Sequence, residues 1–481
     1  MATTLLSPAR VAAHKFEQHM RQRRMIASIA LLLLLEQSLI GVPLLQDWTL
    51  SDSAAAQGDV VRQVIILGVL GVLLLAPSQT RPPMSVPTSI LLLLGYCLVS
   101  VSWAIEPLIS LRRLAFTSAV IWILVRSIGD LGAVRTLRLV RAALVGLLLI
   151  NYVMVMVSSS GVHMAAVTED TSLVGDWRGI TGHKNIAGPA CALTVLLFAF
   201  DRERLPTWVT GAVLAASLIF LYYTHSKTSI AMLGIAFVVG AAMRFYNPRY
   251  RSILLPAVLV LGGLLLGAVV MYFGGVEAIL DDPGAFTGRG SVWSLLLEYS
   301  SEHLWTGAGY QSFWQIGYSS PIWTLTTNWV ARVAGHGHNG YLDTLVTIGL
   351  PGLLLALLVL FVWPAIRLLC SINISRSRRA LLFAILTFCA GHNMSESTML
   401  DRAAPVQVFL MIAVVLIHRL SDQSAGAHQD LRARVARMAG RNGFTALRNR
   451  LTRQTLAPAR ARRPVSRPQP GPSQDLEDGI A

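Results

Sequence analysis

Charged residues are scarce in this sequence. Only 14% of its 481 residues are Asp, Glu, Lys or Arg, whereas 54% are hydrophobic. A soluble globular protein of this length rarely shows such a balance. The apolar residues also occur in blocks of about 17 to 25, the length needed to cross about 30 Å of hydrocarbon. The sequence therefore excludes an ordinary soluble fold and predicts an all-α polytopic membrane protein.

Cysteine is also rare. The chain has four, Cys97, Cys191, Cys370 and Cys389, and each lies in or beside an apolar block. None belongs to a CxxC motif, so the sequence contains neither a disulfide framework nor a cysteine zinc site. We interpret all four as small core residues.

The apolar blocks predict about twelve transmembrane helices. Residues 1–24 are polar, and the apolar run after them is too long for a cleavable signal peptide and has no clear small-residue cleavage site, so the first span is expected to remain as an anchor. The predicted spans are 25–45, 60–77, 86–105, 111–129, 139–158, 185–200, 206–223, 228–243, 253–273, 340–363, 380–395 and 404–419.

Arginines and lysines predict the orientation, because they stay preferentially in cytoplasmic loops. With the N-terminus inside, the basic loops all fall inside as well, and both termini are cytoplasmic. The net charge of +15 follows from this bias and from the tail, so it requires no nucleic acid partner. The expected organisation is a cytoplasmic segment 1–24, a transmembrane domain 25–420 and a basic tail 421–481. This tail, rich in Arg, Pro, Gly and Ser, is predicted to be largely disordered, and a short amphipathic helix on anionic lipid is the alternative.

A few cations break the topological rule and fall on the predicted extracytoplasmic side. Two of the three lysines and seven of the eleven histidines are on this side. Each cation alone could be a helix cap or a snorkelling side chain. Together, beside Gly, Ser, Thr and helix starts, they have the chemistry that a diphosphate requires, and we expect them to meet around one cavity. The candidates are Arg112, Arg113, Arg178, Lys184, Lys227 and Arg289.

The segment 274–339 is the longest extracytoplasmic loop and should fold, because it is neither low in complexity nor strongly charged. Within it, residues 290–305 show helical spacing of Val292, Leu295, Leu296 and Tyr299. Arg289 stands at the start of this predicted helix, and Trp293 is one turn on.

The loop ends in "HGHNG", residues 336–340, at the start of the tenth span. Asn339 suits a helix N-cap. His336 and His338 could be metal ligands at i, i+2, but no acidic or thiol ligands cluster nearby at a recognisable spacing. Alternatively, one histidine is a general base at the water interface. We prefer His338, since His336 lies between two glycines.

Several of these stretches together resemble one known family. "TGRGSVWSLLLEYSSEHLWTGAGYQSFW" followed by "HGHNGYLDTLVTIGLPG" is similar to the core signature of the O-antigen ligase and polysaccharide polymerase family, and resembles its exopolysaccharide polymerase branch most. "SVSWAIEPLISLRR", "RGITGHKN", "THSKTS" and "SES" extend the resemblance over residues 100–400.

The resemblance implies a metal-independent, inverting glycosyltransferase of the bacterial inner membrane without a cofactor. The donor would be a glycan on undecaprenyl diphosphate, and the acceptor a polysaccharide or lipid A core. His338 corresponds to the family's histidine and would be the base. Arg289 is our first choice for the diphosphate, and Arg178 and Lys184 follow.

The remaining candidates have supporting roles in this hypothesis. Glu396, Asn339, His336 and Trp293 would orient the base or the acceptor. Polymerase and ligase differ in acceptor, and the sequence does not decide between them. Membrane lipids and other polysaccharide export components are further candidate partners. A transporter or flippase is a less favoured alternative, because the sequence shows no internal repeat and the charges lie at a membrane face.

Overall fold

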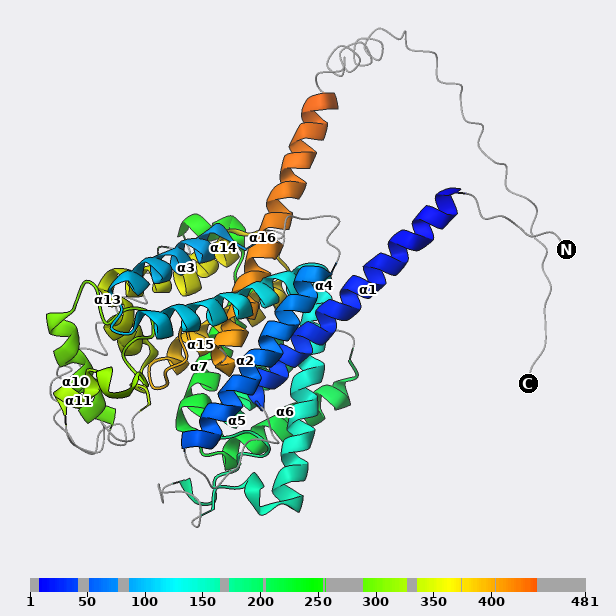
Figure 1. Ribbon diagram of the computed structural model, residues 1–481. Helices are drawn as coiled ribbons and strands as arrows, with labels where there is room; N and C mark the ends of the chain where they lie inside the picture. Colours follow the sequence, from blue (N-terminus) through cyan, green and yellow to red (C-terminus); the bar gives the residue numbers. More distant parts are fainter. Residues whose placement is uncertain are drawn as a thin grey trace, which may run out of the picture. The chain divides into compact units, whose positions relative to one another are not determined.

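The computed structural model describes residues 8–41, 52–76, 86–164, 173–201, 205–253, 256, 289–326, 335–372, 374–402 and 404–438. Apart from one isolated bridge between Val162 and Trp177, the regular secondary structure of these residues is helical (Figure 1). The chain divides into two compact units, Met1–Ser424 and Ala425–Ala481. The site described below belongs to the first unit.

Long apolar helices dominate this unit. Among the described residues, four helices are long and apolar enough to cross a membrane, namely Pro107–Val157, Lys227–Phe245, Gly340–Cys370 and Pro405–Asp422, and four shorter apolar helices accompany them. The chain is therefore an all-helical, multi-pass membrane protein. The number twelve stays a prediction, because most of the expected span 253–273 lies outside the described residues. The long helices are α1 (Pro8–Leu39), α2 (Asp52–Leu75), α3 (Thr88–Ser100), α4 (Pro107–Val157), α5 (Lys184–Phe200), α6 (Thr207–Tyr223), α7 (Lys227–Phe245), α13 (Gly340–Leu357), α14 (Trp363–Cys370), α15 (Arg376–His392) and α16 (Pro405–Met438).

Helix α4 combines two of the predicted spans. As one straight rod its 51 residues would be about 77 Å long, more than twice the thickness of a bilayer core. Gly132 interrupts it with non-helical angles, φ 74° and ψ 164°. Arg113 near one end and Asn151 near the other both bond to loops of the site described below. The chain therefore folds back at Gly132, as the separate spans 111–129 and 139–158 predicted.

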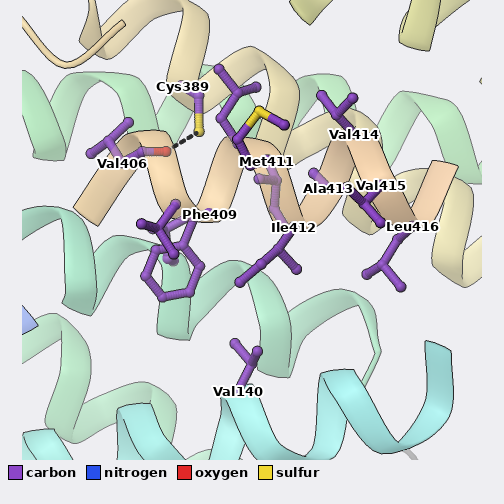
Figure 2. Close-up of a cluster of buried hydrophobic side chains, with 14 of the residues drawn as sticks. Val140, Cys389, Val406, Phe409, Met411, Ile412, Ala413, Val414, Val415 and Leu416 are labelled. Carbon is purple, nitrogen blue, oxygen red and sulfur yellow. Dashed lines mark hydrogen bonds between the residues drawn. The ribbon is translucent and has the colours of Figure 1, made fainter. Parts of the chain in front are cut away.

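Helix α16 passes through the centre of the core. In its window Pro405–Asp422, 78% of the residues are buried, compared with 28% in the window of α7. Figure 2 shows its side chains Phe409 and Ile412 in the same cluster of buried hydrophobic residues as Val140 of α4. The Cys389 thiol of α15 donates to the Val406 carbonyl over 3.7 Å, so this cysteine is a core residue, as expected. The helix continues to Met438, beyond the predicted start of the tail at 421.

Helix α13 is broken where a loop crosses it. Gly349 has φ 69° and ψ 179°, and a Cβ on it would lie 2.3 Å from the Trp305 carbonyl oxygen. Leu350 N–H instead donates to Leu304 O at 2.7 Å, and Ala308 N–H donates to Val346 O at 2.8 Å. The predicted span 340–363 is thus two helical pieces, and the freed backbone groups are satisfied by the crossing loop.

The predicted amphipathic helix of the long loop is present as α10 (Arg289–Glu302). Val292, Leu296 and Tyr299 are buried, and Leu295 packs against the same cluster, as the spacing predicted. This small second core also contains Phe313 and Val346. It fixes α10 and the short α11 (Ile322–Leu325) beside the start of α13 (Figure 1).

Candidate active site

Glu396, in the turn after α15, is the centre of the candidate site. Its Oε1 accepts hydrogen bonds from Arg289 of α10 at 2.9 Å and from the Asn185 amide of α5 at 2.7 Å. Its Oε2 lies 3.5 Å from His338 Nδ1. The Glu396 side chain is only 10% exposed. One buried carboxylate therefore joins four chain segments that are far apart in sequence.

The charge of Glu396 is stabilised by these neighbours. Burial alone raises the pKa of a carboxyl group. The contact with His338 and the charge of Arg289 outweigh burial and lower the pKa of Glu396 to about 2. Glu396 is consequently ionised at every physiological pH and can orient a histidine.

The backbone around His338 is held from several directions. The Gly337 N–H donates to Asp343, 2.9 Å from Oδ2, and Trp293 Nε1 donates to Gly337 O at 2.9 Å. His338 itself has φ 49°, which is unusual for a residue other than glycine. We preferred His338 as the base because glycines on both sides of His336 favour a mobile backbone. In the structure, however, both the N–H and the carbonyl group of Gly337 are hydrogen-bonded. The structure instead builds a defined turn that presents His338.

Asn339 begins α13 as its N-cap, as expected. Its side-chain oxygen accepts from the Tyr341 N–H at 3.0 Å and from the Leu342 N–H at 3.1 Å. Its own N–H donates to the Ser397 hydroxyl at 2.9 Å. Gly340 has no room for a side chain, since a Cβ there would lie 2.2 Å from Asn393 Oδ1. The helix start and the Glu396 turn are therefore packed directly together.

The His338 side chain combines a carboxylate partner with exposure. It is 35% exposed, and its ring lies edge-on to His336 with 4.2 Å between centroids. A carboxylate oxygen 3.5 Å from Nδ1 favours the tautomer with the proton on Nδ1, which leaves the lone pair on Nε2. A histidine in this state can accept a proton from a hydroxyl group.

Arg178 and Lys184 lie in a neighbouring group of the same site. Lys184 Nζ pairs with Asp176 Oδ2 at 2.5 Å, and Arg178 Nε donates to Ser160 O at 2.8 Å. His183 connects this group to the centre. Burial lowers the pKa of His183, Glu396 opposes that shift, and Lys184, His338 and Arg178 add to it. Lys184 thus lies next to the Glu396 group in the structure, because its chain neighbour Asn185 bonds to Glu396.

The remaining predicted cations are Arg113, Arg112 and Lys227. Arg113 is buried and donates to the carbonyl groups of Gln311, Trp314 and Gln315 at 2.5, 2.9 and 2.9 Å. Arg112 and Lys227 are exposed. Lys227 is adjacent to Thr228, whose hydroxyl lies 2.7 Å from that of Ser395, so it stands at the edge of the site.

Three further residues of the site were not selected from the sequence. Asn185 bonds to Glu396, Asp176 neutralises Lys184, and Asp343 holds Gly337. Asn185 follows Lys184 directly in the polar stretch "GHKN", which was the available signal. Among the described residues, no group of three His, Cys, Asp or Glu is arranged to hold a metal.

Comparison with known proteins finds similar sequences. Residues 212–357 match the profile of the family described as O-Antigen ligase. The matched segment contains Arg289, His336, His338 and Asn339, whereas Glu396 lies beyond it. The exopolysaccharide production protein ExoQ of Rhizobium meliloti (strain 1021) is 32% identical over 160 residues, which are 31% of this chain and 37% of that protein. Through these matches residues 212–357 are similar to the O-antigen ligase family, and the chain has distant homology to a protein of exopolysaccharide production.

Proposed function

We propose that this protein transfers a glycan from undecaprenyl diphosphate to a sugar hydroxyl, and so polymerises an exopolysaccharide or O-antigen. The observation that carries the proposal is the convergence of His338, Glu396 and Arg289 from three distant segments. A base, an orienting carboxylate and a cation for a leaving phosphate are the groups that this reaction requires.

In the proposed reaction, Nε2 of His338 takes the proton of the acceptor hydroxyl. The acceptor oxygen attacks the anomeric carbon, and the bond from that carbon to the diphosphate oxygen breaks with inversion. Glu396 holds Nδ1 of His338 and stabilises the imidazolium that forms. Neither step uses a metal ion.

The leaving diphosphate carries its negative charge towards Arg289. A guanidinium has five N–H donors, and this one directs two nitrogens to Ser395 O and Glu396, which leaves donors for phosphate oxygens. Arg178 and Lys184 add positive charge in the same neighbourhood. Lys227, at the edge, and the exposed Arg112 contribute to steering of the anionic donor. For Arg113 we favour a structural role, because its donors face three carbonyl groups.

Attachment of the glycan to lipid A core is the second candidate function. The description of the matched family favours it, whereas the name of the relative ExoQ favours exopolysaccharide production. Both reactions use the same donor chemistry and differ in the acceptor. The donor requires the protein to be in the bacterial inner membrane with the site facing the periplasm, and the basic loops favour cytoplasmic termini. Membrane lipids and other components of polysaccharide export would be its neighbours.

Purified protein in detergent, incubated with lipid-diphosphate glycan and candidate acceptors, tests the proposal. A ladder of lengthening glycans is the expected product. One-step transfer to lipid A core would indicate the ligase. Absence of transfer to either acceptor, or loss of transfer when chelators are added, would refute the metal-free transferase.

The orientation has its own test. Reporter fusions at Gly284 and at the C-terminus should report opposite compartments, because the basic loops alternate along the chain. Gly284 lies outside the described residues, so the experiment also locates the long loop. Identical compartments for both fusions would contradict the topology.

A further inference from the structure

A cavity of about 180 Å³ opens beside the candidate active site. Its wall includes Gln311, Trp314, Gln315, His336, Asp343 and Asp401. His336 also contacts the His338 ring, whereas Arg289, Arg178 and Lys184 are not among the lining residues. His338 therefore contacts both a residue of the cavity wall, His336, and the carboxylate of Glu396.

The lining of the cavity suits a neutral, polyhydroxylated ring. Trp314 provides an aromatic surface, and Gln311 and Gln315 provide amides that can both donate and accept. The two arginines of the wall, Arg113 and Arg402, balance two aspartates in formal charge. The volume is below the range of about 300–1,000 Å³ typical of sites for drug-sized ligands, so it fits one sugar ring better than an oligosaccharide.

Backbone strain is concentrated around this cavity. Among the described residues, five other than glycine have positive φ: His225, Gln311, Gln315, His338 and Leu400. Three of them line the cavity and a fourth is His338. A left-handed conformation is unfavourable for a residue with a Cβ and persists only where its surroundings impose it, commonly at functional sites.

Arg113 imposes this conformation on the wall. Its guanidinium is bonded to three carbonyl groups of residues 311–315, and Gln311 Nε2 donates to Leu400 O at 2.7 Å. Trp314 is fixed separately, because its Nε1 donates to Asp343 Oδ1 at 2.8 Å. The same Asp343 holds Gly337, next to His338. One carboxylate therefore couples the position of the aromatic surface to that of the base.

We propose that this cavity binds the acceptor as a single uncharged sugar ring, placed against Trp314 with its attacking hydroxyl towards His338. The inference rests on the proposed glycan transfer and identifies its second substrate site. It also explains why the cavity and the cations near Glu396 are formed by different residues. Inversion requires the acceptor and the leaving diphosphate on opposite sides of the anomeric carbon, and Arg289, which pairs with Glu396, is not among the residues that line the cavity.

The test is a kinetic comparison of full-length variants. The acceptor is the donor's own glycan released from its lipid, titrated at saturating lipid-linked donor. Gln315→Gly removes one lining amide, and it should fold at least as stably as the wild type because glycine tolerates φ 54°. Its acceptor KM should rise about tenfold, the effect of one lost hydrogen bond, with donor KM and kcat within about twofold.

Tyr318→Ala is the matched control. Tyr318 belongs to the same loop, is 96% exposed and does not line the cavity, so its acceptor KM should equal that of the wild type. An unchanged acceptor KM in Gln315→Gly, a rise in donor KM instead, or a released glycan that neither accepts nor competes would overturn the acceptor site. Failure of the wild type to transfer from lipid-linked donor to any acceptor would instead refute the proposed function.

Discussion

The two ends of the helical bundle both carry arginine–carboxylate pairs, but they use them differently. Near Gly132, Asp130 lies between Arg23 at 2.5 Å and Arg126 at 3.1 Å. At the other end, Glu396 is shared by an arginine, an amide and a histidine. The first arrangement joins α1 to α4 through an ion pair that is also a hydrogen bond. The second leaves a titratable ring partly exposed beside a cavity, and this difference, rather than the number of ion pairs, marks the site.

The largest expected effect is that of His338→Ala. General base catalysis typically contributes 10²- to 10⁴-fold, so transfer should fall by that factor while the protein still inserts and binds donor. His336→Ala should lose much less, because it is His338 whose Nδ1 lies 3.5 Å from Glu396. The measurement compares the transfer rates of the two purified variants, and donor binding is measured separately. Near-normal transfer by His338→Ala would exclude it as the base.

Arg289 should be second in effect. Removing one preorganised group that stabilises developing negative charge costs about 10²- to 10³-fold in rate. Arg289→Ala should lose activity on that scale, and Arg289→Lys should restore part of it, since lysine keeps the charge but not the two-pronged geometry. If both variants kept the wild-type kcat, the leaving diphosphate would have to be stabilised elsewhere.

Glu396→Gln should change stability in a pH-dependent manner. The folded-state pKa of Glu396 is about 2, below its ordinary value of 4.5. A lowered pKa stabilises the fold above pH 4.5, and this contribution is lost as the pH falls through about 2. The variant should therefore be less stable than the wild type at pH 7 by up to about 3 kcal/mol. Thermal unfolding from pH 7 to pH 2 should show the difference shrinking below pH 4.5, and a constant difference would contradict the assignment.

At the opposite end, Asp130→Asn should affect stability without affecting transfer. Losing the charge shared by Arg23 and Arg126 should cost about 1–3 kcal/mol. The thermal midpoint should fall, whereas transfer per folded molecule at low temperature should equal that of the wild type. A selective loss of transfer would show that the two ends are not functionally distinct.

Asn339 should give the smallest effect. Replacing an N-cap asparagine by alanine costs about 1 kcal/mol, and aspartate keeps the accepting oxygen. Asn339→Ala should therefore lower the thermal midpoint, and Asn339→Asp should not. A stable Asn339→Asp protein with at least tenfold lower transfer would instead assign the amide a role in the reaction.

The sequence predicted the members of this site better than their partners. Arg289, His338 and Glu396 each stand in a short polar stretch between apolar runs, and such stretches must gather at the membrane surface. Arg113 stands in a similar stretch, yet its partners are main-chain carbonyl groups that no side-chain pattern reveals. Asn185 was missed for a related reason, because an uncharged amide is conspicuous only when its carboxylate partner is in view.

The fold, like the site, could be predicted from the sequence only in part. Hydropathy located the apolar helices, since their composition is a local property of the chain. The break at Gly349 was not predicted, because it depends on the backbone of residues 304–308 crossing α13. The apolar sequence around Gly349 does not indicate that a distant loop crosses the helix there. Sequence patterns therefore identify helices well and their interruptions poorly.

The reversal at Gly132 also has a consequence for biosynthesis. The two halves of α4 are joined by a single non-helical residue, which leaves almost no loop to thread separately. We therefore expect the ribosome-bound chain to deliver both halves to the membrane as one helical hairpin, with Arg126, Arg135, Arg138 and Arg141 near the turn keeping it on the side of synthesis.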